Sequence, residues 1–90
     1  MKLADWARSV KLRDECCVLC SSFDQLQAHH VYPRAVFPSM SSCIDNGLTL
    51  CTTCHRAWHL DSKKWRAWWS AHWPERARKI KAMLPMEARR

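Results

Sequence analysis

The sequence has no apolar run long enough to cross a membrane or to act as a signal peptide. It has no low-complexity tract, and it has no internal repeat beyond two short Cys-x2-Cys motifs. We therefore expect neither a membrane span nor an export signal. A chain without an export signal is expected in a reducing compartment, and we predict a cytoplasmic protein.

Acidic residues are scarce, because 8 Asp and Glu stand against 15 Lys and Arg, for a net charge of +7. The imbalance lies near the C-terminal end: residues 1–60 carry a net charge of +1, and residues 61–90 carry +6. A basic C-terminal third favours a polyanionic partner, with nucleic acid the leading candidate. A solvated basic surface without a partner would explain the charge equally well.

Ninety residues predict a single small domain, in which a hydrophobic core alone stabilises the fold only marginally and a bound metal often contributes. Four of the six cysteines form two pairs with metal-ligand spacing. The pairs are Cys17-x2-Cys20 and Cys51-x2-Cys54. In a reducing compartment such pairs bind metal more often than they form disulfides, so we predict one tetrahedral structural Zn²⁺ held by the four thiolates. The alternative is four buried thiols without a metal. Cys16 and Cys43 are interpreted as spare thiols, although Cys16 could compete with Cys17 as a ligand.

Periodicity predicts a helix over residues 3–13 and two short strands over 26–32 and 48–51. A long loop, rich in proline and serine, joins the strands over residues 33–47, and Asn46-Gly47 predicts a tight turn at its end. Three further helices are predicted: one from Cys54 capped by Thr52 or Thr53, one over 63–72 capped by Ser62, and one opening at Pro74. The pattern indicates a small α+β fold.

Four histidines and one asparagine lie between and just after the cysteine pairs. His29 and His30 are neighbours on a predicted strand, so their side chains point to opposite sides and cannot do the same work. His55 and His59 stand at i and i+4 on a predicted helix and therefore share one face. These two can join the metal-facing member of the His29-His30 pair in a three-imidazole site. Asn46 could tie the loop to the strand or supply an amide oxygen to the metal. Each residue alone has an ordinary structural explanation, but their order between the cysteines is poorly explained by chance.

These motifs resemble those of the HNH endonucleases, in particular the zinc-stapled, phage-type members. The resemblance covers roughly residues 13–60 and rests on three segments: Cys17-Val18-Leu19-Cys20, Ala28-His29-His30-Val31-Tyr32-Pro33, and Asp45-Asn46-Gly47-Leu48-Thr49-Leu50-Cys51-Thr52-Thr53-Cys54-His55. It implies a ββα-metal motif stapled by zinc, flanked by an N-terminal helix and C-terminal helices. It also implies metal-dependent hydrolysis of DNA phosphodiesters in a bacterial or phage-infected cell.

The resemblance assigns a role to each of the five residues. His30 would be the general base, Asn46 would hold the loop that orients it, and His29, His55 and His59 would bind one catalytic divalent metal. Many relatives have Asp at the position of His29, so the metal identity stays open among Mg²⁺, Mn²⁺, Ni²⁺ and Zn²⁺, with imidazoles favouring the transition metals. A glycine is also common in the family at the position of Ser21, and this departure affects a turn rather than the chemistry.

Residues 61–90 form a basic, tryptophan-rich helical extension of the 13–60 core within the single domain 1–90. Trp65, Trp68, Trp69 and Trp73 either fill the core or stack on nucleic-acid bases, and we favour the core for most of them. Six basic side chains are predicted to contact phosphates. They are Lys63, Lys64, Arg66, Arg76, Arg78 and Lys79.

The sequence thus predicts a metal-dependent DNA endonuclease, a nickase or a double-strand cutter, acting as a monomer or homodimer. The chain is too short for a separate specificity domain, so a partner protein could supply targeting. The rival hypothesis is a non-catalytic zinc module that binds nucleic acid or protein, and an RNA-directed nuclease of the same fold is a third.

Overall fold

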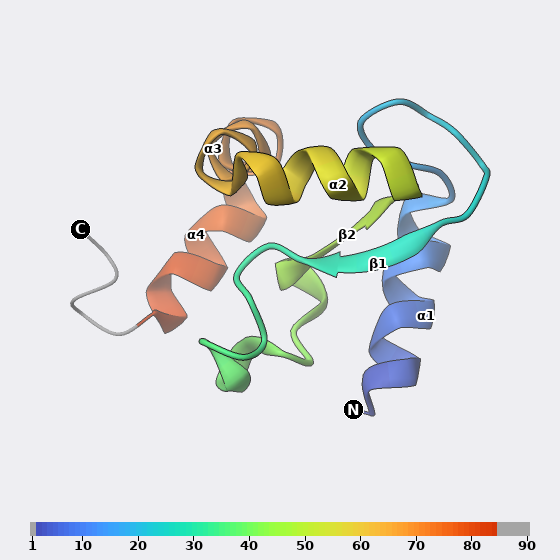
Figure 1. The fold of residues 1–90 in the computed structure, drawn as a ribbon. Coiled ribbons are helices and arrows are strands. Elements are labelled where there is room, and N and C mark those ends of the chain that lie inside the picture. Colours follow the sequence, from blue (N-terminus) through green and yellow to red (C-terminus); the bar gives the residue numbers. More distant parts are fainter. Residues whose placement is uncertain (1, 85–90) are drawn as a thin grey trace.

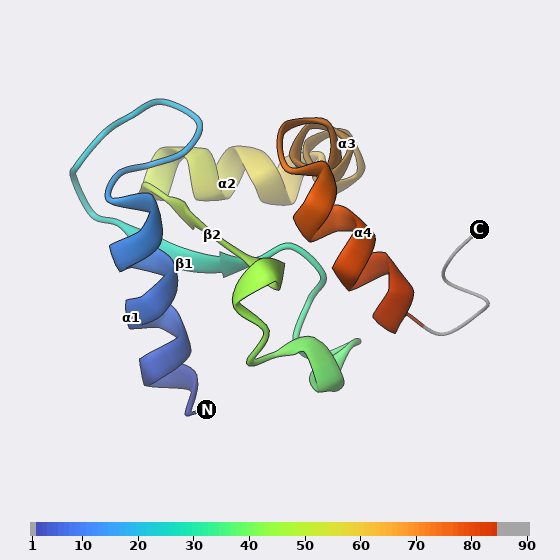
Figure 2. The same ribbon diagram turned by 180° about the vertical axis from the view of Figure 1, so that it is seen from behind.

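A two-stranded antiparallel sheet lies between two helices in the computed structural model, which describes residues 2–84 (Figures 1 and 2). Strand β1 (Gln27–His30) pairs with β2 (Gly47–Leu50), so that His30 lies opposite Gly47. Helix α1 (Leu3–Asp14) packs on one face, and helix α2 (Thr52–Leu60) packs on the other. This arrangement confirms the predicted small α+β class.

Both faces of β2 are covered, which explains why all four of its residues are buried. Thr49 donates its hydroxyl to the carbonyl of Val10 in α1, whereas His29, across from Leu48, contacts Trp58 in α2. A strand covered on both sides loses the alternation of polar and apolar residues that marks a half-exposed strand.

Helix α1 is held against the sheet by an apolar and a polar contact. Trp6 and Val10, one turn apart, are its buried side chains. At its end, the Asp14 carboxylate accepts the backbone N–H of Thr49 at 2.9 Å, while Arg13 donates to the carbonyl of Gly47 at 2.7 Å. The polar bonds align the helix with β2, so the helix forms one wall of the structure around His30.

The loop between the strands contains two short 3-10 helices, η1 (Pro38–Met40) and η2 (Ile44–Asn46). The turn predicted before the second strand is present and ends at Asn46 in η2, whereas Gly47 is extended (φ −122°) and begins β2. Glycine is needed at position 47 for a steric reason. A Cβ there would lie 2.6 Å from Cγ2 of Val10 and 2.7 Å from Cζ2 of Trp6. Glycine permits the close approach of α1 to β2.

The remaining helices are α3 (Ser62–His72) and α4 (Pro74–Met83), which follow α2 directly. Two of the predicted caps are wrong. Helix α2 begins at Thr52, two residues before the predicted start, with Cys51 at the N-cap and no side-chain cap. Helix α3 is capped by Asp61, whose carboxylate accepts the N–H of Lys64, and Ser62 is its first residue. Pro74 opens α4 as predicted.

The tryptophans of the C-terminal helices belong mainly to the core. Trp69 is fully buried, as is Trp58 of α2, while Trp65, Trp68 and Trp73 are half-buried against the same cluster. The basic extension therefore completes the core that the small sheet begins. Among the described residues, no helix has both the length and the apolar character needed to span a bilayer.

Candidate metal centres and active site

The fold brings the four predicted zinc ligands together from two segments. Cys17 and Cys20 lie in the loop between α1 and β1, Cys51 follows β2, and Cys54 lies in the first turn of α2. Their Sγ atoms all lie within 4.8 Å of one another, and those of Cys20 and Cys51 are 3.7 Å apart. Tetrahedral Zn–S bonds place sulfurs about 3.8 Å apart, so the cluster fits one Zn²⁺.

The surroundings of these thiols are consistent with thiolate ligands. Burial raises the pKa of Cys17, but hydrogen bonds from the backbone of Cys51, Cys20 and Leu19 outweigh it and lower the pKa to about 7. Burial, together with the neighbouring sulfurs, raises the pKa of Cys54. Backbone donors thus favour the first thiolate, and further thiolates so close together require a cation to offset their repulsion.

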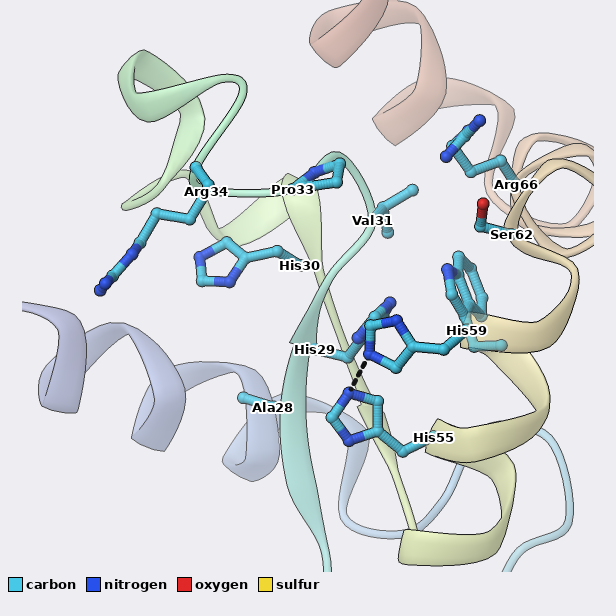
Figure 3. Close-up of a pocket in the computed structure, with 12 residues that line it drawn as sticks. Ala28, His29, His30, Val31, Pro33, Arg34, His55, His59, Ser62 and Arg66 are labelled. Carbon is cyan, nitrogen blue, oxygen red and sulfur yellow. Dashed lines mark hydrogen bonds between the residues drawn. The ribbon is translucent and has the colours of Figure 1, made fainter.

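A second cluster forms between β1 and α2, where His29, His55 and His59 bring one ring nitrogen each within 4.8 Å of one another (Figure 3). The Nε2 atoms of His55 and His59 are 3.0 Å apart, close to the spacing of about 3.3 Å that two imidazoles take around a tetrahedral zinc. His29 is buried, and its Nε2 has no hydrogen-bond partner among the described residues. Because a buried ring nitrogen without a partner is costly, this atom fits a metal ligand.

The histidine cluster is electrostatically prepared to bind a cation. Burial, helped by the charges of His55 and His59, lowers the pKa of His29 to about 3, and burial likewise lowers the pKa of His55. The amide oxygen of Gln27 accepts from Nδ1 of His55, which leaves the lone pair of that ring on Nε2, facing His59. The rings of His29 and His55 are therefore neutral at neutral pH, as metal ligands must be.

His30 lies on the other side of β1, away from the histidine cluster (Figure 3). Its Nε2 donates to the backbone carbonyl of Ser41 at 2.8 Å, and its ring stacks on that of Trp6. A carbonyl can only accept, so the proton of the neutral ring sits on Nε2 and the lone pair on Nδ1. The structure thus sets the tautomer in which Nδ1 is the basic atom.

Asn46 is completely buried and joins three parts of the loop. Its Oδ1 accepts the N–H of Tyr32 at 2.9 Å, and its Nδ2 donates to the carbonyls of Tyr32 and Met40 at 3.1 and 3.2 Å. Met40 directly precedes Ser41, the partner of His30. Asn46 therefore holds the segment that carries the Ser41 carbonyl, and its side-chain oxygen bonds to the backbone of Tyr32.

A cleft of about 480 Å³ contains His30 and the histidine cluster together. Two basic side chains, Arg34 and Arg66, also line it, with Trp58 among its apolar residues. No acidic residue lines the cleft among the described residues. A cleft of this size, with imidazoles and guanidinium groups and no carboxylate, suits an anionic ligand such as a phosphate.

Of the six predicted phosphate contacts, only Arg66 lines this cleft, where its guanidinium also lies over the Tyr32 ring. Lys63 and Lys64 are exposed on α3. The other three lie on α4 and each has a partner nearby. Arg76 lies over Trp73, Arg78 pairs with Glu75 at 2.6 Å, and Lys79 approaches Asp45 at 4.0 Å.

Sequence reasoning missed four residues around the site: Trp6, Gln27, Arg34 and the Ser41 carbonyl. Arg34 had a weak signal, since it follows the His29-His30 strand by a few residues. Trp6 and Ser41 contact His30, and Gln27 contacts His55, only through the tertiary fold. No spacing rule would have found these contacts.

In a comparison with known families, the profile described as HNH endonuclease matches residues 17–61, half of the chain. The matched segment contains both ligand clusters and His30, and it leaves out helices α1, α3 and α4. No curated protein and no solved structure matches the chain.

Proposed function

This chain belongs to the HNH endonuclease family, and we propose that it hydrolyses DNA phosphodiester bonds with His30 as general base. One divalent metal would bind to His29, His55 and His59. The observation that carries the proposal is the shared cleft, which is lined by a histidine of defined tautomer on one side of β1 and by three convergent imidazoles on the other.

His30 would take a proton from the attacking water through Nδ1, while Nε2–H stays bonded to the Ser41 carbonyl. A positioned general base contributes roughly 10²–10⁴-fold to a rate, provided that its reactive atom faces the water. The carbonyl of Ser41 also stabilises the imidazolium that forms, because it accepts from a ring that has become more acidic.

A divalent ion bound by the three histidines would supply stabilisation of the charge that develops on the phosphoryl and leaving 3′ oxygens. Three imidazoles without a carboxylate favour Mn²⁺, Co²⁺, Ni²⁺ or Zn²⁺ over Mg²⁺. We therefore expect the transition metals to support cleavage at lower concentrations than Mg²⁺.

The zinc site would act structurally, by holding α2 against the sheet. Cys54 and His55 are neighbours in the first turn of α2, so the position of the cysteine site sets that of two metal-binding histidines. Arg66 and Arg34, in the cleft, would contact the phosphate at the cut. The exposed Lys63 and Lys64 would contact the flanking DNA backbone, with Arg76, Arg78 and Lys79 extending this surface along α4.

A supercoiled-plasmid assay with Mg²⁺, Mn²⁺, Ni²⁺, Zn²⁺ or EDTA tests the proposal. We expect metal-dependent open circles from the wild type and a loss of at least about 10²-fold in His30→Ala, with zinc content and folding unchanged. His72→Ala is the matched control, because His72 is exposed on α3, does not line the cleft, and contacts only the neighbouring Trp68 and Trp73 among the described residues. The His72→Ala variant should cut at the wild-type rate. In the wild-type assay, early appearance of linear plasmid would indicate two active sites acting together.

Cleavage by His30→Ala at the wild-type rate would overturn the mechanism. Failure of the wild type to cut with any metal, combined with a gel shift of DNA, would instead favour the non-catalytic binding module.

A further inference from the structure

We propose that Trp6 is a positioning residue for His30, so that helix α1, which lies outside the family match, is part of the catalytic apparatus. This inference rests on the proposed role of His30 as general base. It assigns a function to a helix that would otherwise be explained as packing alone.

The indole and imidazole rings lie face to face. Their centroids are 3.8 Å apart, and their planes differ by 5°. Trp6 is only 1% exposed, so its ring is held by the surrounding packing and cannot swing away without opening the structure. A flat, immobile indole therefore restricts the plane in which the imidazole can lie.

Trp6 is also tied to the loop that holds the edge of the same imidazole. Its Nε1 donates to the carbonyl of Cys43 at 2.8 Å, and Ser41, two residues earlier, accepts from Nε2 of His30. The indole thus fixes the plane of His30 and the carbonyl fixes its rotation within that plane. Nδ1 is the ring nitrogen left for the water.

The contact depends on the one glycine of the chain. Gly47 pairs with His30 across the sheet, so both positions face α1. A Cβ at Gly47 would lie 2.7 Å from Cζ2 of Trp6, which means that the indole occupies the space of the missing side chain. Trp6 reaches His30 because no side chain stands between them at this position.

Three variants separate positioning from packing. Trp6→Phe keeps a flat ring, whereas Trp6→Met keeps apolar bulk without one, and both lose the bond to Cys43. Val10→Ala is the control, since it weakens the docking of α1 from a neighbouring buried position and leaves the Trp6–His30 stack in place.

The readout is steady-state nicking at a temperature where every variant is folded. We expect Trp6→Met to lower kcat about 10–100-fold with KM and metal affinity unchanged, because misplacing a catalytic group costs rate rather than binding. Trp6→Phe should recover most of kcat, and Val10→Ala should match the wild type.

A second measurement reports the contact without activity. In NMR spectra of histidine-labelled protein, the ring protons of His30 should be shifted upfield by the indole ring current. The shift should remain in Val10→Ala and disappear in Trp6→Met. Unshifted His30 protons in the wild type would overturn the inference, as would a Trp6→Met protein with wild-type kcat beside an inactive His30→Ala. A wild type that cuts no DNA but shows the upfield shift would instead refute the proposed function while leaving the contact in place.

Discussion

His29 and His30 are adjacent in β1, yet their rings lie against different helices. The ring of His29 lies 4.9 Å from that of Trp58 in α2, and the ring of His30 lies 3.8 Å from that of Trp6 in α1. The alternation of a strand thus places one histidine at the buried end of an imidazole cluster and the other beside a carbonyl acceptor. Two residues of the same type acquire different chemistry from their two environments.

Removal of one zinc ligand should unfold the domain. In Cys51→Ser the cluster loses a buried thiolate, and because structural zinc binding is coupled to folding, we expect no cooperative thermal transition and less than one zinc per chain. Cys16→Ser is the matched control, since this neighbouring cysteine is outside the cluster and should leave zinc content and melting unchanged. Cooperative melting of Cys51→Ser with full zinc content would contradict the four-cysteine site.

Lowering the pH should destabilise the protein when no catalytic metal is added. The pKa of His29 is about 3 in the folded protein against about 6.5 in an unfolded chain, so the unfolded state alone takes up a proton as the pH falls below 6.5. Above pH 6.5 the ring is neutral in both states, so His29 adds little pH dependence there. Between pH 7 and 5.5 the free energy of unfolding should decrease by about 1 kcal/mol. The measurement is the difference in urea unfolding free energy between the wild type and His29→Asn. A difference independent of pH would show that His29 is not buried as a neutral ring.

Asn46→Ala should cost about 3 kcal/mol of stability. The change removes three hydrogen bonds and leaves the N–H of Tyr32 and the carbonyl of Met40 without that partner in a buried environment. It should also lower nicking activity, because the segment with the Ser41 carbonyl loses its tie. Denaturant unfolding and the plasmid assay measure the two effects, and Ser42→Ala, at an exposed position of the same loop, should alter neither. Equal stability of Asn46→Ala and the wild type would refute this role.

Gly47→Ala should destabilise the protein by about 1–3 kcal/mol, because the added methyl group would overlap Val10 and Trp6. Combining it with Val10→Ala should recover only part of the loss, since the indole remains in place. A thermodynamic cycle of the two variants measures this coupling. Full recovery in the double variant would show that the indole is free to move.

Ser21→Gly should stabilise the protein, in contrast to Gly47→Ala. Ser21 adopts a left-handed conformation (φ 66°) in the turn of the first cysteine pair, and a side chain there costs about 1 kcal/mol. Glycine would remove this cost, but its greater conformational freedom in the unfolded chain offsets part of the gain. We therefore expect about 0.5 kcal/mol of stabilisation. Thermal melting with zinc bound checks it, and a lower melting temperature would mean that the turn is not strained.

The sequence was most informative where chemistry depends on short spacing. A Cys-x2-Cys turn directs two sulfurs to one point, and the i, i+4 separation of His55 and His59 does the same for two imidazoles. It was less accurate at the element ends, where Asp61 rather than Ser62 caps α3 and Gly47 is extended rather than in a turn. There, competing local choices have similar free energies, and tertiary packing selects between them.

The amino-acid sequence by itself therefore determined the members of the cysteine and histidine clusters, because each cluster is built from local geometry that a turn, strand or helix enforces. Only the tertiary structure decided what surrounds His30. Its partners Trp6 and Ser41 come from a separate helix and from the loop between the strands, and no spacing rule predicts contacts that arise from packing the whole chain around one core. Gly47 is a second example. The sequence shows that a glycine follows Asn46, but only the packing of α1 on β2 explains why a larger residue would not fit there.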